Sequence, residues 1–162
     1  MTLKVLVIYD SQYGNTEKIA WAIRDALSDG AETRLVRASN VAPSDMSAVD
    51  LLIVGSPTQR FHATEPIDHL LKGVSLRGVQ AAAFDTRFDM HEVDSRALRL
   101  AVKVAGDEAA YAAPRISAAL EKVGATIAAP PEGFIVTGTE GPLRDDELQR
   151  AGEWAKGILA NL

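Results

Sequence analysis

Cysteine is absent from the 162 residues of this chain. Its absence excludes disulfides, thiolate metal sites, iron–sulfur clusters and cysteine nucleophiles. The three histidines, His62, His69 and His91, lack the spacing of a metal motif, so we predict no metal site. No run approaches the ~20 consecutive apolar residues that span a bilayer, and the N-terminus lacks the features of a signal peptide. We therefore expect a cytoplasmic protein without a membrane span.

Positive charge is also in short supply, because the formal net charge is −5 at pH 7. A protein that binds nucleic acid needs a basic face to neutralise phosphates, so we expect no nucleic-acid partner. The hydrophobic fraction of 47% is ordinary for a soluble globular protein. The length fits one hydrophobic core, which predicts a single domain over residues 1–162.

Short apolar runs alternate along the chain with segments of helical spacing. The apolar runs predict strands at 4–9, 33–37, 50–55 and 79–84, and a fifth strand at 126–129 and 134–136. Pro130 and Pro131 interrupt that fifth strand, so we expect it to lie at an edge or to be broken. Helices are predicted at 16–27, 65–72, 114–123 and 144–160. This order predicts an α/β fold with a parallel sheet, helices on both faces, and ligands beyond the carboxyl ends of the strands.

One connection, at about 89–113, is long for this kind of fold. Apolar and other residues alternate over 98–104, which suggests a short extra strand, with a helical turn as the alternative. Arg96, Arg99 and Lys103 are mixed with acidic residues in this segment. A lid, a partner surface, a dimer contact and a decorated solvent-facing loop all stay open for it.

The loop after the first strand reads Ser11-Gln12-Tyr13-Gly14-Asn15-Thr16. It leads into a helix N-terminus, where free backbone N–H groups and the helix dipole favour an anion. The loop contains no Lys or Arg, so the pattern indicates a phosphomonoester held by neutral donors. The alternative is an ordinary capped strand–helix turn, because Ser, Asn and Thr all cap helices. Neither a P-loop nor a G-x-G-x-x-G motif is present.

Residues 7–20, Val-Ile-Tyr-Asp-Ser-Gln-Tyr-Gly-Asn-Thr-Glu-Lys-Ile-Ala, resemble the signature of the flavodoxin family. In that family an apolar strand enters a Ser/Thr-x-x-Gly-x-Thr loop that holds the phosphate of flavin mononucleotide (FMN). The resemblance extends over most of the chain, with 89–113 as the exception. It implies a flavodoxin-like three-layer fold with a five-stranded parallel sheet in the order 2-1-3-4-5, and FMN as the cofactor. By the same resemblance the FMN phosphate ligands come from the loop of Ser11, Gln12, Tyr13, Gly14, Asn15 and Thr16.

Two further loops are implied to hold the flavin ring. The loop after the third strand is similar to those of flavodoxins and of flavodoxin-like quinone reductases, and its candidates are Ser56, Pro57, Thr58, Gln59, Arg60 and Phe61. The loop after the fourth strand offers Asp85, Thr86, Arg87 and Phe88 at the pyrimidine edge. Phe61 and Phe88 have two alternatives each, packing on the ring or anchoring a loop in the core. Arg87 either faces the flavin or lies in solvent.

The implied function is electron transfer between redox partner proteins, with the chemistry supplied by the flavin. No catalytic residue is evident in the sequence. One alternative is an NAD(P)H-dependent quinone or flavin reductase, so enzyme activity of its own stays open. Against the reductase, the fourth-strand loop lacks a Gly-Gly-Gln type of segment. A second alternative is a flavin-free binding or regulatory module on the same fold. The sequence leaves the oligomeric state open.

Arg60 and Arg87 lie where the family usually avoids positive charge. A fixed cation stabilises the anionic, fully reduced flavin, by at most roughly 3 kcal/mol at ~6 Å and an effective dielectric of ~20. We therefore predict a less negative potential for the second electron than acidic flavodoxins have.

Overall fold

A computed structural model describes residues 2–89 and 95–162 of the chain. His91 and the rest of residues 90–94 lie outside this description. The strands are β1 (Lys4–Tyr9), β2 (Glu32–Arg37), β3 (Leu51–Pro57), β4 (Gln80–Arg87), β5 (Thr126–Ile127) and β6 (Glu132–Ile135). They form one sheet in the order β2-β1-β3-β4-β5. Strand β6 also pairs with β4, along its C-terminal half, whereas β5 pairs with its first two residues. Every pairing between these strands is parallel, which confirms the predicted fold class and strand order.

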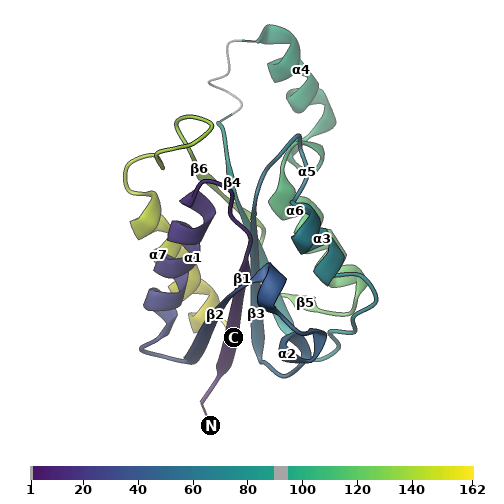
Figure 1. Ribbon diagram of the computed structural model, residues 1–162, viewed down its shortest axis with the longest axis vertical. Helices are drawn as coiled ribbons and strands as arrows, with labels where there is room; N and C mark the ends of the chain where they lie inside the picture. Colours follow the sequence, from purple (N-terminus) through teal and green to yellow (C-terminus); the bar gives the residue numbers. More distant parts are fainter. Residues whose placement is uncertain (1, 90–94) are drawn as a thin grey trace.

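Helices cover both faces of the sheet, as Figure 1 shows. They are α1 (Asn15–Leu27), α2 (Pro43–Ser47), α3 (Glu65–Leu70), α4 (Arg96–Ala105), α5 (Asp107–Ala110), α6 (Ala112–Lys122) and α7 (Glu147–Ala160), with a 3₁₀ turn, η1, at Ala38–Asn40. α1 and α7 lie against one face, and α3 and α6 lie against the other (Figure 1). No described helix is both long and apolar enough to cross a membrane.

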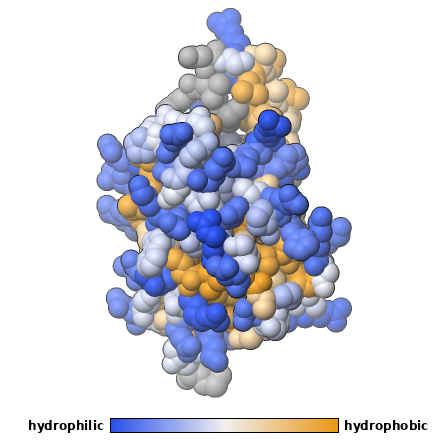
Figure 2. All heavy atoms as spheres, viewed as in Figure 1, coloured by the Kyte–Doolittle hydropathy of each residue, from blue (hydrophilic) through white to orange (hydrophobic). Residues whose placement is uncertain are grey.

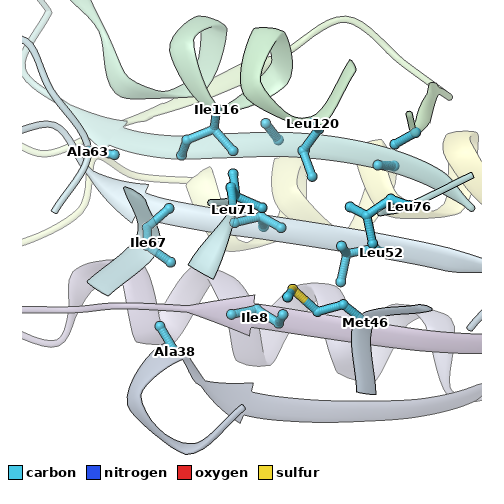
Figure 3. Close-up of a cluster of buried hydrophobic side chains, with 14 of the residues drawn as sticks. Ile8, Ala38, Met46, Leu52, Ala63, Ile67, Leu71, Leu76, Ile116 and Leu120 are labelled. Atoms are coloured by element: carbon cyan, nitrogen blue, oxygen red, sulfur yellow. The ribbon is translucent and has the colours of Figure 1, made fainter. Parts of the chain in front are cut away.

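The strand sequences are nearly continuously apolar because both faces of the sheet are buried. Alternate residues of β1 belong to different cores: Val5 and Val7 face α1 and α7, whereas Leu6 and Ile8 face α3 and α6. Figure 3 shows Ile8 among the buried side chains on the α3 and α6 face. The period-2 alternation of β1 thus joins two hydrophobic layers through one strand.

An aromatic cluster fixes α7 to the sheet. The rings of Phe84 on β4, Phe134 on β6 and Trp154 on α7 meet edge to face, with centroids 6.0 to 6.2 Å apart. Gly55 on β3 makes room for this cluster, because a Cβ there would lie 2.0 Å from the Phe84 ring. The cluster therefore depends on a glycine in the middle of a buried strand.

The structure corrects the extra strand suggested at 98–104, which is instead part of helix α4. The alternation arises because Leu98 and Val102 face the small core beside α5, whereas Leu100 and Val104 are exposed. Ser95 begins the helix, since its hydroxyl accepts a hydrogen bond from the Leu98 N–H at 3.2 Å. In Figure 1 this helix lies at the top, outside the layered body, and Figure 2 shows apolar atoms gathered there.

The interrupted fifth strand is broken into two strands, β5 and β6, which both pair with β4, and this confirms one of the two predicted alternatives. Pro130 and Pro131 fall between them, where no ladder N–H is needed. Helix α2 was not predicted, because it is only 5 residues long. Pro43 begins it, and Asp45 accepts a hydrogen bond from the Ala42 N–H at 3.0 Å.

Candidate functional site

A cleft of about 270 Å³ opens beyond the carboxyl ends of β1, β3 and β4. This is the place where open parallel sheets bind ligands, since the loops after neighbouring strands meet there. The cleft is lined by Ser11, Gln12, Tyr13, Asn15, Thr16, Pro57, Thr58, Gln59, Arg60, Thr86, Arg87, Phe88, Val136 and Thr139. Three loops that the sequence singled out therefore come together at one site.

The loop of residues 11–16 wraps tightly around the start of α1. Gly14 has φ of +90°, a conformation that glycine adopts without steric cost. The Ser11 hydroxyl accepts hydrogen bonds from the N–H groups of Gly14, at 3.1 Å, and Glu17, at 3.4 Å. The N–H groups of Asn15 and Thr16, in the first helical turn, have no acceptor among the described residues. The loop thus presents unpaired donors at a helix N-terminus, which suits an anion.

An arginine from β2 supports this loop from behind. Arg37 lies beside Tyr9 in the β1–β2 register, and its guanidinium donates to the backbone carbonyl of Ser11 at 3.1 Å. The same guanidinium lies 3.3 Å from carboxylate oxygens of Asp10 and of Glu17. Burial, together with a hydrogen bond to Glu17, raises the pKa of the Tyr9 hydroxyl. Arg37 was not a predicted site residue, although the ends of two paired strands necessarily meet.

Two side chains of the loop tie it to other parts of the cleft wall. The Thr16 hydroxyl, which is buried, lies 2.7 Å from the hydroxyl of Thr86 at the end of β4. The Asn15 amide donates to the carbonyl of Glu140 at 3.1 Å. Gly141 allows this approach, because a Cβ there would lie 2.7 Å from the Asn15 side chain. The segment before α7 therefore completes the cleft, and it contributes Thr139, which the sequence did not single out.

The loop after β3 ends in a tight two-residue turn. Gln59 and His62 exchange two backbone hydrogen bonds of 2.9 Å. Between them Arg60 and Phe61 have φ of +50° and +71°, as both central residues of a type I′ turn require. Non-glycine residues rarely adopt this region, so the turn carries backbone strain. The Gln59 amide also donates to the side chain of Gln12, which links this turn to the first loop.

The predicted ring-binding residues divide between the cleft and its surroundings. Pro57, Thr58, Gln59, Arg60, Thr86, Arg87 and Phe88 line the cleft. Ser56 is buried behind it, where its hydroxyl accepts from the Thr64 N–H at 3.0 Å. Phe61 lies outside the cleft, against an apolar groove that α4 and α5 form with it. Phe88 is 42% exposed, so it is not a core anchor.

Asp85 and Arg87 form a forked ion pair at the end of β4. The Arg87 Nε and Nη2 atoms lie 2.6 and 2.8 Å from the two Asp85 carboxylate oxygens. The guanidinium lies over the ring of Tyr111, 3.6 Å from its centroid. On Gly133 of β6, a Cβ would lie 2.1 Å from the Arg87 Nε, so only glycine leaves room for the guanidinium. Arg87 thus lies neither free in solvent nor free to move.

Asp85 also holds the start of α6. Its carboxylate accepts from the Ala113 N–H at 2.7 Å, while the Thr58 hydroxyl accepts from the Ala112 N–H at 3.0 Å. The Asp85 side chain is fully buried, and this burial raises the pKa of its carboxyl above the usual value. Hydrogen bonds from Arg87, Ala113 and Thr58 oppose that shift. Since all of these partners are donors, the site accommodates the ionised carboxylate.

The chain matches the family model described as flavodoxin over residues 7–154. It is 42% identical over 57 residues to a flavodoxin of Aquifex aeolicus (strain VF5). That match covers 34% of this chain, and the chain spans about a third (31%) of the length of that curated relative.

Solved flavodoxins show a similar fold. A flavodoxin from the domain Archaea is 20% identical with a TM-score of 0.74, over 98% of this chain and 97% of that one. Oxidised flavodoxin 1 from Bacillus cereus is 17% identical with a TM-score of 0.76, over 98% of this chain and 99% of that one. At these identities the likeness shows the fold alone, whereas the family model covers most of the sequence. The chain therefore belongs to the flavodoxin family.

Proposed function

We propose that this chain binds FMN in the cleft described above and transfers electrons between redox partner proteins. Flavodoxins as a family bind FMN and transfer electrons to partner proteins. The observation that carries the proposal is the unpaired N–H donors of the 11–16 loop, at the N-terminus of α1, opening into the cleft. These donors suit a phosphate group, and the remaining cleft suits the flavin attached to it.

The phosphate end of the cleft contains hydroxyl, amide and backbone donors but no lysine or arginine side chain within the loop. Asn15 and Thr16 are buried to 7% and 1% exposure, so their first-turn N–H groups are held in a fixed direction. Arg37 adds positive charge behind the loop through the Ser11 carbonyl. We infer that the loop binds the phosphate mainly through N–H groups and a helix dipole that point at it, and less through direct ion pairs.

The ring end of the cleft suits a flat aromatic molecule. Tyr13 and Phe88 line it and are 47% and 42% exposed, so each offers an uncovered ring face or edge. Thr58 and Gln59 bring polar groups to the opposite loop. The redox chemistry is supplied by FMN when it is bound, and the residues of the chain hold the ring and limit its contact with water.

The first test is a fluorescence titration of the apoprotein with FMN and with riboflavin, which lacks the phosphate. We expect FMN to bind with quenched fluorescence and to bind at least tenfold more tightly than riboflavin. A Thr16→Val variant is expected to weaken FMN binding and to leave riboflavin binding nearly unchanged. The matched control is Thr126→Val, at an exposed position on β5, which should behave as wild type in both titrations. If FMN does not bind even at high concentration, the proposal is wrong.

A second measurement separates the carrier from a reductase. The FMN-loaded protein is mixed with NADPH and, separately, with NADH without oxygen, and the visible absorbance of oxidised flavin is followed. We expect no rapid bleaching with either until a partner reductase is added, because the loop after β4 lacks the Gly-Gly-Gln type of segment expected of a flavodoxin-like quinone reductase. Rapid bleaching by either nucleotide alone would instead assign NAD(P)H-dependent reductase activity to the chain.

A further inference from the structure

Two arginines line the cleft, and they differ in what surrounds them. From the sequence, Arg60 and Arg87 are both candidate cations at the flavin, with a place in solvent as the alternative for Arg87, and both line the cleft. Arg87 contacts Asp85 and Tyr111 and lies against Gly133, whereas Arg60 is exposed at the tip of the Gln59–His62 turn. A charge affects a bound flavin according to its distance and to the other charges near it, so these two arginines need separate treatment.

The charge of Arg87 is compensated within the protein. Its side chain is 14% exposed and forks onto Asp85, whose own side chain is fully buried. The Tyr111 ring covers the guanidinium on one side, and Gly133 leaves the space that it occupies. Because the Asp85 carboxylate accepts hydrogen bonds from the Arg87 guanidinium and the Ala113 N–H, the pair combines one positive and one negative charge. Toward a flavin bound in the cleft, this pair therefore acts as a dipole and not as a net positive charge.

The charge of Arg60 differs, because it forms no ion pair with any acidic residue in the part of the chain that the structure describes. Its φ of +50° results from the two backbone hydrogen bonds that close the turn, and these hold its Cα at the cleft edge. The side chain thus adds an uncompensated positive charge on the wall that the loop after β3 gives to the cleft.

We propose that Asp85 is a positioning residue that holds Arg87 in place and cancels its charge, and that Arg60 is the cation that sets the preference of the cleft for reduced over oxidised FMN. This inference rests on the proposed function, and it separates two arginines that the sequence-based prediction of a less negative potential had taken together. Arg60 favours the reduced cofactor because the added negative charge lies near its guanidinium. Arg87 adds little to this preference as long as Asp85 is ionised and paired.

The test is a potentiometric titration of the FMN-loaded protein and of single variants, together with the affinity for oxidised FMN and the urea stability of each apoprotein. For Arg60→Gln we expect the affinity for fully reduced FMN, relative to oxidised FMN, to fall about tenfold, which makes the two-electron midpoint potential about 30 mV more negative. Arg60→Lys should keep the wild-type potential. The matched control is Arg77→Gln, an exposed position before the opposite end of β4, where the same loss of charge should leave the potential unchanged.

Changes to the ion pair should move the potential in opposite directions. Asp85→Asn leaves the charge of Arg87 uncompensated, so reduced FMN should be favoured by several-fold. Arg87→Gln leaves a buried carboxylate beside the cleft, so reduced FMN should be disfavoured. A purely structural role of the pair would change apoprotein stability in both variants without this reversal of sign. If neither variant folds, the comparison of Arg60→Gln, Arg60→Lys and Arg77→Gln still decides the role of Arg60.

The outcomes separate this inference from the proposed function. If the wild type binds no FMN, the proposed function fails before any potential is measured. If FMN binds but Arg60→Gln and Arg77→Gln shift the potential equally, the assignment to Arg60 is overturned and FMN binding stands. The same holds if Arg60→Lys does not keep the wild-type potential. If Asp85→Asn folds and leaves the potential unchanged, the charge cancellation by Asp85 is overturned.

Discussion

Two arginine–carboxylate pairs occupy opposite faces of the sheet with the same set of contacts but opposite effects on the carboxyl group. Asp85–Arg87 lies on the α6 side and Glu147–Arg150 on the α7 side. Each carboxylate also accepts a backbone N–H at 2.7 Å, and each guanidinium lies over an aromatic ring, 3.6 and 4.5 Å from the centroid. β6 lies between them, and Gly133 touches both pairs, since its carbonyl accepts from Arg150 at 2.5 Å.

The depth of burial explains the difference. Asp85 is fully buried, and this burial raises the pKa of its carboxyl despite the donors around it. Burial also raises the pKa of Glu147, but the hydrogen bonds from Arg150 and the Ile135 N–H outweigh it, so the net pKa is lowered. The same ion pair is therefore a net stabilising contact where water still reaches its edge, and a costly one where water does not. The costly pair lies at the proposed FMN cleft, where charge bears on function.

The largest expected effect of breaking either pair is on stability at α7. Glu147→Gln removes the charged hydrogen bonds from Arg150, which keeps its ion pair with Glu132, and weakens the anchor of α7 on β6. We expect a loss of about 2 to 3 kcal/mol in the free energy of unfolding at pH 7, measured by urea denaturation of the apoprotein. Glu153→Gln, at an exposed position on the same helix, is the control and should change stability little. If Glu147→Gln lost as little stability as Glu153→Gln, the Glu147–Arg150 pair would not be a net stabilising contact.

The two carboxylates should also respond to pH with opposite signs. The pKa of Glu147 is lowered on folding, so its stabilisation is complete above the ordinary value of 4.5 and is lost as pH falls through the lowered pKa. The pKa of Asp85 is raised, so wild type gains stability, relative to Asp85→Asn, as pH falls through the raised pKa toward 3.8. Urea titrations of wild type, Glu147→Gln and Asp85→Asn between pH 7 and about pH 3 should therefore show stability differences that change in opposite directions. If both stability differences changed in the same direction with pH, the two carboxyl groups would not have oppositely shifted pKa values.

Gly133 allows both pairs to be disturbed by one methyl group. In Gly133→Ala the new Cβ would meet the Arg87 guanidinium, with 2.1 Å to Nε, so the arginine must move off Asp85. We expect a loss of about 2 kcal/mol in unfolding free energy, together with weaker FMN binding, because the cleft wall shifts. Gly157→Ala is the control, since a Cβ there meets nothing within 4 Å and alanine favours the helix. A Gly133→Ala protein as stable as wild type would show that Arg87 is not confined.

Much of the fold was predictable because short apolar runs typical of buried strands alternate along the chain with segments of helical spacing. The run at residues 4–9 is apolar on both faces, and the structure covers both faces with helices. The cleft loops were also predictable, since parallel strands deliver their following loops to one edge. The strand suggested at 98–104 failed because two-residue alternation also fits a helix that buries Leu98 and Val102. The hydrophobic pattern of a short segment cannot distinguish a strand from a helix unless a strand that would pair with it is known.

The contacts inside the site were less predictable than its location. Asp85 and Arg87 stand two residues apart on a strand, which does place them on one face, so their pairing had a signal in the sequence. Tyr111 and Gly133 had no such signal, because their approach to Arg87 depends on how α6 and β6 pack. Arg37 reaches the first loop only through the β1–β2 register. Candidate site residues follow from strand order, whereas their charge state follows from tertiary contacts.

The smallest expected effect concerns the aromatic ring in each pair. Phe134 belongs to the main core beneath α1 and α7, whereas Tyr111 belongs to the small cluster beside α4 and α5, so the stacking contact is better tested at Tyr111. Tyr111→Leu removes the ring beneath Arg87 and should cost about 1 kcal/mol in unfolding free energy, with little change in FMN affinity, because Asp85 still holds the guanidinium. Tyr111→Phe keeps the ring, so this control should retain the stacking contribution. If Tyr111→Leu weakened FMN binding as much as Arg87→Gln, Tyr111 would be the main support of Arg87, and the ion pair would be secondary.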